Sequence, residues 1–213
     1  MKIKKIGHCC LVLETGGKKI MTDPGSYTPA AESETGIDIV LITHEHGDHF
    51  HVESLKKILA ANPQVVVVTN SAVGKLLRAE NIPFTQVEDS ESESVNGILI
   101  EGFGTTHALV YDSIPSVMNT GYFVDNSFYF PGDAFYNPGK EVQVLALPMA
   151  GPWLKLSEAL DYLKLVRPTV AFNVHDGMII PASSGFLAHL GQMAGQEDGT
   201  KFVYMGNGDI AEF

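Results

Sequence analysis

The chain has 213 residues, with 25 acidic against 14 basic side chains and a formal net charge of −11. This length suits one domain over residues 1–213, which would bury roughly 70% of the surface that its unfolded chain exposes. The acidic balance disfavours binding to nucleic-acid phosphates. The longest apolar runs, such as Val65–Val68, are too short to cross a membrane. We therefore expect a globular protein that has neither nucleic acid nor membrane as a partner.

The only two cysteines, Cys9 and Cys10, are adjacent in an apolar segment. Neighbouring residues of a strand face opposite sides, so this pair is a poor structural disulfide. A vicinal thiol pair can bind a soft metal or sense redox state, but packing is the favoured interpretation. With no disulfide framework and no recognisable export signal, we expect a cytoplasmic location.

The first half of the chain predicts short strands followed by helices. An antiparallel meander is expected over Lys2–Ile6, Cys9–Glu14 and Lys18–Thr22, and further buried strands over Ile37–Thr43 and Val65–Thr69. Val52, Leu55 and Ile58 recur at helical spacing, and Asn62-Pro63 ends that helix. Ser71 is expected to cap a second helix that runs to Glu80.

The second half repeats this alternation. Glu88–Ser94 is acidic and serine-rich, which predicts a surface turn. Strands are expected over Ile98–Phe103, Gly121–Val124, Ser127–Phe130, Val142–Leu147 and Thr169–Val174, and helices over Ser157–Val166 and Ser184–Ala194. Strands that alternate with helices favour an α/β class, with helices covering sheet layers.

The strongest functional signal is the segment Thr43–His49. It holds four potential metal ligands within six residues, namely His44, His46, Asp48 and His49. The segment lies where a buried strand gives way to a helix, the place at which α/β sheets form sites. Imidazole and carboxylate are ligands that zinc prefers. Four ligands this close cannot surround one ion without strain, so we expect the two pairs to serve two ions, with Gly47 allowing the turn between them.

The pattern His44-x-His46-x-Asp48-His49 resembles the signature of the metallo-β-lactamase superfamily. The resemblance extends to His107, Asp133 and His175, each placed after an apolar strand, and to Asp23 in Met21-Thr22-Asp23-Pro24. It implies an αββα sandwich, in which two mixed β-sheets pack face to face with helices on the outside. It also implies that His107 and His175 complete the ligand set, that Asp133 bridges the two ions, and that Asp23 shapes the site from below.

The opening Gly7–Val12, together with Lys19–Pro24 and Leu147–Trp153, is similar to the ascorbate-6-phosphate lactonase-like branch. That resemblance implies that His8 lies near the site, where it would orient substrate or donate a proton. An equally good alternative is a strand-end histidine bonded to a backbone carbonyl. Candidate substrate contacts in nearby loops are Trp153, Lys155 and Tyr111; a core anchor is the alternative for Trp153.

The chemistry that we expect is attack by hydroxide held between two divalent ions on a small lactone, ester, amide or phosphodiester. Zinc is the expected metal, with manganese and iron as alternatives. Asp48 would bind one ion and pass a proton to the leaving group. Two other hypotheses stay open: a mononuclear iron-dependent oxidoreductase of the same fold, and a non-catalytic metal-binding protein. The expected partner is a small-molecule substrate, and a homo-oligomer is left open.

Overall fold

The computed structural model describes residues 1–213 and contains two seven-stranded β-sheets. The first sheet has the order β14-β1-β2-β3-β4-β5-β6, with β1 (Lys2–Gly7), β2 (Cys10–Thr15), β3 (Lys18–Thr22), β4 (Ile39–Ile42), β5 (Val66–Thr69), β6 (Thr85–Gln86) and β14 (Ile210–Glu212). The second has the order β13-β12-β11-β10-β9-β8-β7, with β7 (Ser92–Val95), β8 (Ile98–Phe103), β9 (Gly121–Val124), β10 (Phe128–Phe130), β11 (Val144–Pro148), β12 (Val170–Val174) and β13 (Lys201–Val203). Each sheet contains both parallel and antiparallel pairs.

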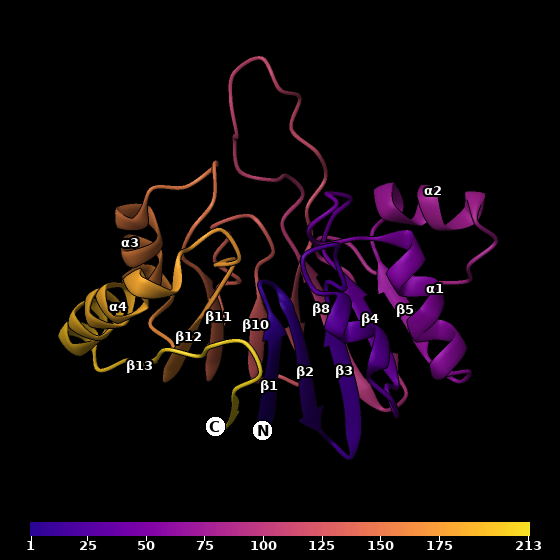
Figure 1. The fold of residues 1–213 in the computed structure, drawn as a ribbon, viewed down its shortest axis with the longest axis horizontal. Coiled ribbons are helices and arrows are strands. Elements are labelled where there is room, and N and C mark those ends of the chain that lie inside the picture. Colours follow the sequence, from indigo (N-terminus) through magenta and orange to yellow (C-terminus); the bar gives the residue numbers. More distant parts are fainter.

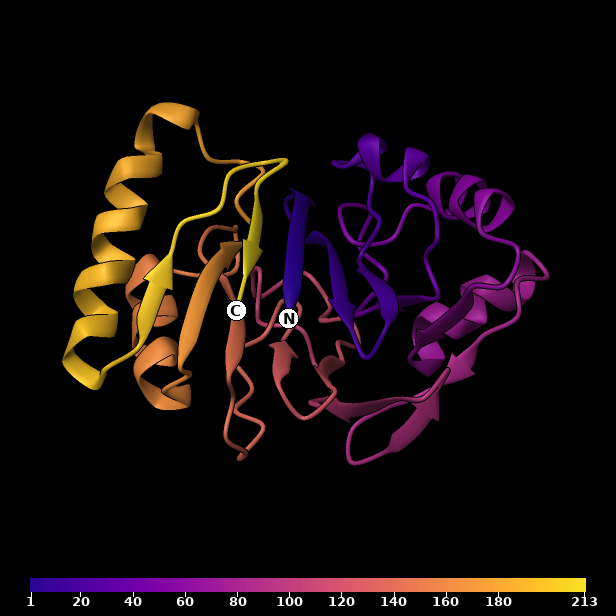
Figure 2. The same ribbon diagram turned by 90° about the horizontal axis from the view of Figure 1, so that it is seen from below.

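Four α-helices cover the outer faces of the two sheets. Figures 1 and 2 show α1 (Val52–Ala61) and α2 (Ser71–Ala79) beside the first sheet, and α3 (Leu156–Val166) and α4 (Ser184–Asp198) beside the second. Two 3₁₀ turns, η1 (Pro29–Ser33) and η2 (Pro181–Ser183), complete the helical elements. The predicted αββα sandwich is therefore confirmed.

Strand β4 shows why the layers form. All four of its residues are buried, and because side chains alternate along a strand, they face two different cores. Ile39 and Leu41 join the core between the sheets, whereas Val40 and Ile42 join the core beneath α1 and α2. A strand covered on both faces is a continuous apolar run, which is the pattern seen in this segment.

Strand direction brings six loops to one edge of the sandwich. In the first sheet β1, β3 and β4 run the same way, because β2 is antiparallel to both of its neighbours and β3 is parallel to β4. In the second sheet β8, β10 and β12 also run the same way, because β9 is antiparallel to both of its neighbours and β10, β11 and β12 are parallel. The loops that follow these six strands carry the candidate site.

Three details of the sequence prediction need correction. Ser92–Val95, expected to lie partly in a surface turn, forms the edge strand β7, paired antiparallel with β8. Helix α2 is capped by Asn70, whose side chain accepts a hydrogen bond from the Val73 N–H, and not by Ser71. Helix α4 continues to Asp198, four residues beyond its predicted end at Ala194. Pairing at a sheet edge depends on tertiary context, which local patterns do not encode.

None of the helices is both long enough and apolar enough to span a bilayer.

Candidate metal centre

The ligand segment after β4 is held as a tight loop by backbone and side-chain hydrogen bonds. The amides of His49 and Phe50 both donate to the carbonyl of His46, at 2.9 and 2.8 Å. Beneath the loop, the buried carboxylate of Asp23 accepts hydrogen bonds from the amide and the hydroxyl of Thr43, at 2.8 and 2.7 Å. Asp23 thus lies under the loop, where the resemblance placed it.

One group of three histidines gathers on one side of the site. The ligand atoms of His44, His46 and His107 all lie within 4.8 Å of one another. His107 comes from the loop after β8, more than fifty residues from the other two in the sequence. Three imidazoles at this spacing provide the ligands that one divalent ion needs.

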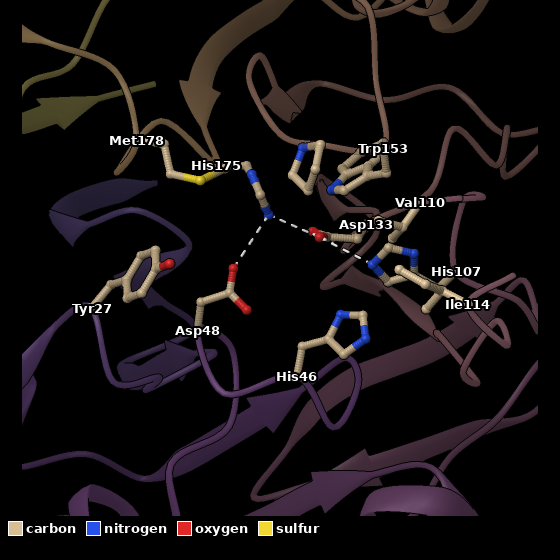
Figure 3. Close-up of a pocket in the computed structure, with 11 residues that line it drawn as sticks. Tyr27, His46, Asp48, His107, Val110, Ile114, Asp133, Trp153, His175 and Met178 are labelled. Carbon is tan, nitrogen blue, oxygen red and sulfur yellow. Dashed lines mark ion pairs between the residues drawn. The ribbon is translucent and has the colours of Figure 1, made fainter. Parts of the chain in front are cut away.

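A second group gathers beside the first and shares Asp133 with it. His175 Nε2 lies 2.8 Å from Asp133 Oδ2 and 3.6 Å from Asp48 Oδ2, and His49 Nε2 lies 3.1 Å from Asp133 Oδ1. On the other side, His107 Nε2 is 3.3 Å from Asp133 Oδ2. Asp133 therefore faces both groups, which is the position that a bridging carboxylate needs (Figure 3).

Four of the histidine rings form a hydrogen bond through Nδ1, which leaves Nε2 available to bind a metal ion. Nδ1 of His44, His49 and His107 is bonded to Thr43 Oγ1, Asp23 Oδ2 and Ala108 O respectively, at 3.0, 2.6 and 2.5 Å. His175 Nδ1 is bonded to Ala150 O. Among the ligands, the buried atoms that form no hydrogen bond of acceptable geometry are Nε2 of His44, His49, His107 and His175, together with Asp133 Oδ1, although three of these nitrogens lie within 3.3 Å of an Asp133 oxygen.

Buried polar atoms without partners are costly, so a convergent group of them requires an occupant. Four Nε2 atoms whose rings are oriented through Nδ1 are the arrangement found around protein-bound metals. The residues therefore fit divalent metal ions.

The protonation states of His44 and Asp48 suit metal binding. Burial and the neighbouring His49 charge hold the pKa of His44 well below its usual value, so its ring is neutral. Burial alone would raise the pKa of Asp48, but the hydrogen bond from His8 and the charges of His49 and His175 lower it to about 2. Neutral imidazoles and ionised carboxylates are the forms that bind metals. At His49 the carboxylates of Asp133 and Asp23 outweigh burial and raise the pKa well above 6.5, so this ring must release a proton when it binds a metal ion.

His8 contacts this centre. Its Nε2 is 3.1 Å from Asp48 Oδ2, and its Nδ1 accepts a hydrogen bond from the Gly177 amide at 3.0 Å. An accepting Nδ1 places the ring proton on Nε2, so His8 donates to Asp48. The structure brings His8 beside the predicted ligand; its bonds go to a carboxylate and an amide N–H, not to a backbone carbonyl.

The three candidate substrate contacts lie in different places. Trp153 is buried, lines the cavity over the ligands, and has ring centroids 5.8 and 5.6 Å from those of His107 and His175. Tyr111 is 66% exposed and does not line the cavity. Lys155 is exposed, does not line the cavity, and occupies the N-cap position of α3, where its amide bonds to Glu158. The proposed contacts of Tyr111 and Lys155 with substrate stay predictions.

Sequence reasoning missed several neighbours of the site. Cys9 has the packing role that the sequence favoured, and its sulfur also lies within 4.8 Å of ligand atoms of His49 and His175. Burial, together with nearby carboxylates, raises the pKa of its thiol well above 9.0. Cys9 packs between the sheets and Cys10 beneath the helices, on opposite faces as expected, and both are free. Tyr27 and Met178 line the cavity, but no local pattern marked them.

The comparisons with known proteins agree with this geometry. A protein-family model described as the Beta-lactamase superfamily domain matches residues 2–175. The protein Rv0786c of Mycobacterium tuberculosis is 34% identical over 190 residues, covering 87% of this chain and 88% of that protein. A UPF0173 metal-dependent hydrolase of Aeropyrum pernix is 27% identical over 201 residues, covering 83% and 82%.

Solved structures share the fold. Igni18, a metallo hydrolase from Ignicoccus hospitalis, has a TM-score of 0.76 at 21% identity and covers 100% of this chain and 98% of its own. An isothiocyanate hydrolase from Delia radicum gut bacteria has a TM-score of 0.73 at 17% identity, covering 100% and 99%. With a family model that spans most of its length, the chain belongs to the metallo-β-lactamase superfamily.

Proposed function

We propose that this metal-dependent hydrolase binds two divalent ions and cleaves a small lactone, ester, amide or phosphodiester. His44, His46 and His107 would hold one ion, and Asp48, His49 and His175 the other, with Asp133 between them. Zinc suits these nitrogen and oxygen ligands, and manganese or iron(II) are alternatives. When bound, such ions lower the pKa of water to about 7 and polarise the scissile group.

The residues of the chain would then orient the reactants and move one proton. The side chain of Asp48 is 23% exposed, which makes it the more accessible of the two carboxylates of the site. We propose that Asp48 receives the proton lost by the attacking water and passes it to the leaving group. His8 would hold this carboxylate in place through its Nε2–H.

One observation carries the proposal: the unpartnered Nε2 atoms converge on Asp133 from two groups of ligands. The direct test is elemental analysis of untagged protein purified without chelators, beside an Asp133→Ala variant. We expect about two zinc or manganese ions per chain in the wild type and fewer in the variant, because the shared ligand is lost. Less than one ion per chain after saturation with each metal would exclude a dinuclear site.

The same sample tests the two alternatives. One retained iron per chain, with oxygen consumption, would favour an iron-dependent oxidoreductase. Full metal loading without hydrolysis of any ester, lactone, amide or phosphodiester would favour a non-catalytic metal-binding protein. The lactonase-like branch stays a proposal that rests on the opening motif and the Leu147–Trp153 loop; hydrolysis of lactones in preference to open-chain esters would support it.

A further inference from the structure

The cavity over the metal ligands has a volume of about 330 Å³, at the lower end of the range for small-molecule sites. Part of its lining consists of the ligands His46, Asp48, His107, Asp133 and His175. The other lining residues are aliphatic or aromatic, namely Tyr27, Val110, Ile114, Pro152, Trp153 and Met178. The metal ligands therefore form the floor of the cavity, and the aliphatic and aromatic side chains form an apolar wall above this floor.

This wall is assembled from four separate segments, which follow β3, β8, β11 and β12. Figure 3 shows Val110, Ile114 and Trp153 on the side of His107, and Tyr27 and Met178 on the opposite side of the site. The residues Ile114, Met178 and Tyr27 are 49%, 50% and 52% exposed. Three large apolar side chains held half-exposed around one opening gain hydrophobic burial only when something apolar enters.

The segment that carries Val110 and Ile114 is anchored at its base. It connects β8 to β9 and forms the long loop at the top of Figure 1. The His107 amide donates to the carbonyl of Val117 at 3.0 Å, and the Ala108 amide donates to the carbonyl of Asp133 at 2.8 Å. These bonds tie the base of the loop directly to two residues of the metal centre, and Val110 and Ile114 of the loop line the cavity beside the ligands.

Away from the ions, the cavity offers no protein cation to an anionic substituent. Its lining contains the two carboxylates Asp48 and Asp133 and no lysine or arginine. Outside the ligands, its hydrogen-bonding side chains are the hydroxyl of Tyr27 and the buried, unpartnered indole N–H of Trp153. A carboxylate or phosphate pressed against the apolar wall would lose its hydration without gaining a counter-charge.

We infer that the substrate is an uncharged small molecule whose apolar substituent packs against the wall formed by Ile114, Trp153, Met178 and their neighbours. The inference rests on the proposed function, because it places the scissile group at the metal floor and the substituent above it. It narrows the substrate class to neutral esters, lactones or amides with an alkyl or aryl portion, and disfavours substrates that carry a second anionic group.

The test uses two probes that differ only in a terminal charge. The metal-loaded protein is assayed with 4-nitrophenyl hexanoate and with mono-4-nitrophenyl adipate, whose acyl chain has the same length but ends in a carboxylate. We expect kcat/KM to be at least ~10-fold higher for the hexanoate. Equal values, or a preference for the adipate, would overturn the inference.

Two lysine variants test whether the apolar wall causes the preference for the hexanoate. Ile114→Lys places a cation at the cavity, and we expect it to reduce the hexanoate preference by ~5-fold or more by favouring the carboxylate. Leu165→Lys is the matched control, because Leu165 is 60% exposed and lies outside the cavity lining; it should keep the wild-type preference. A preference that changes equally in both variants would mean that overall charge, not the wall, selects the substrate.

A binding measurement separates this inference from the proposed function. Trp153 is the only tryptophan of the chain and lines the cavity, so its fluorescence reports occupancy. We expect hexanamide to change this fluorescence at concentrations at least ~10-fold lower than adipamate, the amide with the terminal carboxylate. If hexanamide binds more tightly than adipamate but neither ester is hydrolysed, the proposed hydrolase function is rejected and the apolar subsite is supported. No response to hexanamide, or equal responses, would reject the subsite itself.

Discussion

His8 Nε2 lies 3.1 Å from the Oδ2 atom of Asp48, and the Gly177 amide fixes the opposite nitrogen of the same ring. Asp48 follows β4 and His8 follows β1, so this bond joins two loops of the first sheet across the metal centre. His8 has a positive φ of 47°, which costs free energy in a non-glycine residue and places its ring over the site.

We expect His8→Ala to lower kcat/KM and metal affinity by about 10- to 100-fold, because Asp48 loses the donor that orients it. Metal titration and steady-state kinetics on the same preparation measure both effects. His189→Ala is the matched control, since His189 is exposed on α4. Unchanged metal affinity and activity in His8→Ala would show that Asp48 needs no support from His8.

A buried ion pair stabilises the region behind His175. Lys5 Nζ lies 2.7 Å from Asp176 Oδ2 and also donates to the carbonyls of Asn173 and Met205, at 3.0 and 3.1 Å. We expect Lys5→Met to lower the free energy of unfolding by about 3–5 kcal/mol, because it leaves the Asp176 carboxylate buried without its partner. Urea unfolding followed by circular dichroism measures the loss.

The neighbouring residue provides the control for Lys5. Lys4 pairs with Glu34 at 2.6 Å on a partly exposed surface. Lys4→Met should therefore lower the free energy of unfolding by about 1 kcal/mol or less. Losses of equal size in the two variants would contradict a special role for the buried pair. The double variant Lys5→Met/Asp176→Leu should recover part of the stability, because no buried charge is left unpaired.

The stability of the protein should also depend on the titration of Lys5. Burial lowers the pKa of Lys5 from 10.5, although the Asp176 carboxylate counteracts this shift. In the pH range between the lowered pKa and 10.5, the unfolded chain binds more protons than the folded protein. The free energy of unfolding of the wild type, relative to Lys5→Met, should therefore rise with pH across that range. Paired urea titrations from neutral to alkaline pH measure it; a falling difference would refute the assignment.

Gly25 makes a close backbone contact under the ligand loop. A Cβ atom at Gly25 would lie 1.8 Å from the carbonyl oxygen of Asp48 and 2.5 Å from the His49 amide. We expect Gly25→Ala to destabilise the fold by about 1–3 kcal/mol and to weaken metal binding, because the loop must shift. Thermal unfolding and metal titration measure the two effects.

Gly185→Ala is the matched substitution for Gly25→Ala. A Cβ at Gly185, in α4, meets no atom within 4 Å, and alanine favours the helical conformation. The free energy of unfolding of this variant should therefore stay unchanged or rise by up to ~1 kcal/mol. Equal destabilisation by both variants would mean that the close contact at Gly25 is not responsible.

The sequence by itself determined the layers of the fold and the metal ligands in the loop after β4. Apolar segments such as Ile39–Ile42 specify buried strands through their own composition, and His44–His49 carries its ligands at adjacent positions, so both are local properties. His107, Asp133 and His175 were predictable only through a family resemblance, because each is an isolated residue at a strand end.

Tertiary structure decided what local pattern cannot encode. The common direction of six strands brings His8, Asp23 and the distant ligands to one edge, and that direction follows from pairings between remote segments. The polar segment Ser92–Val95 became a strand because β8 offered an edge to pair with, against its own weak propensity. The apolar wall of Tyr27, Ile114 and Met178 likewise exists only after folding, because exposed loop residues acquire a shared surface when their anchoring strands meet.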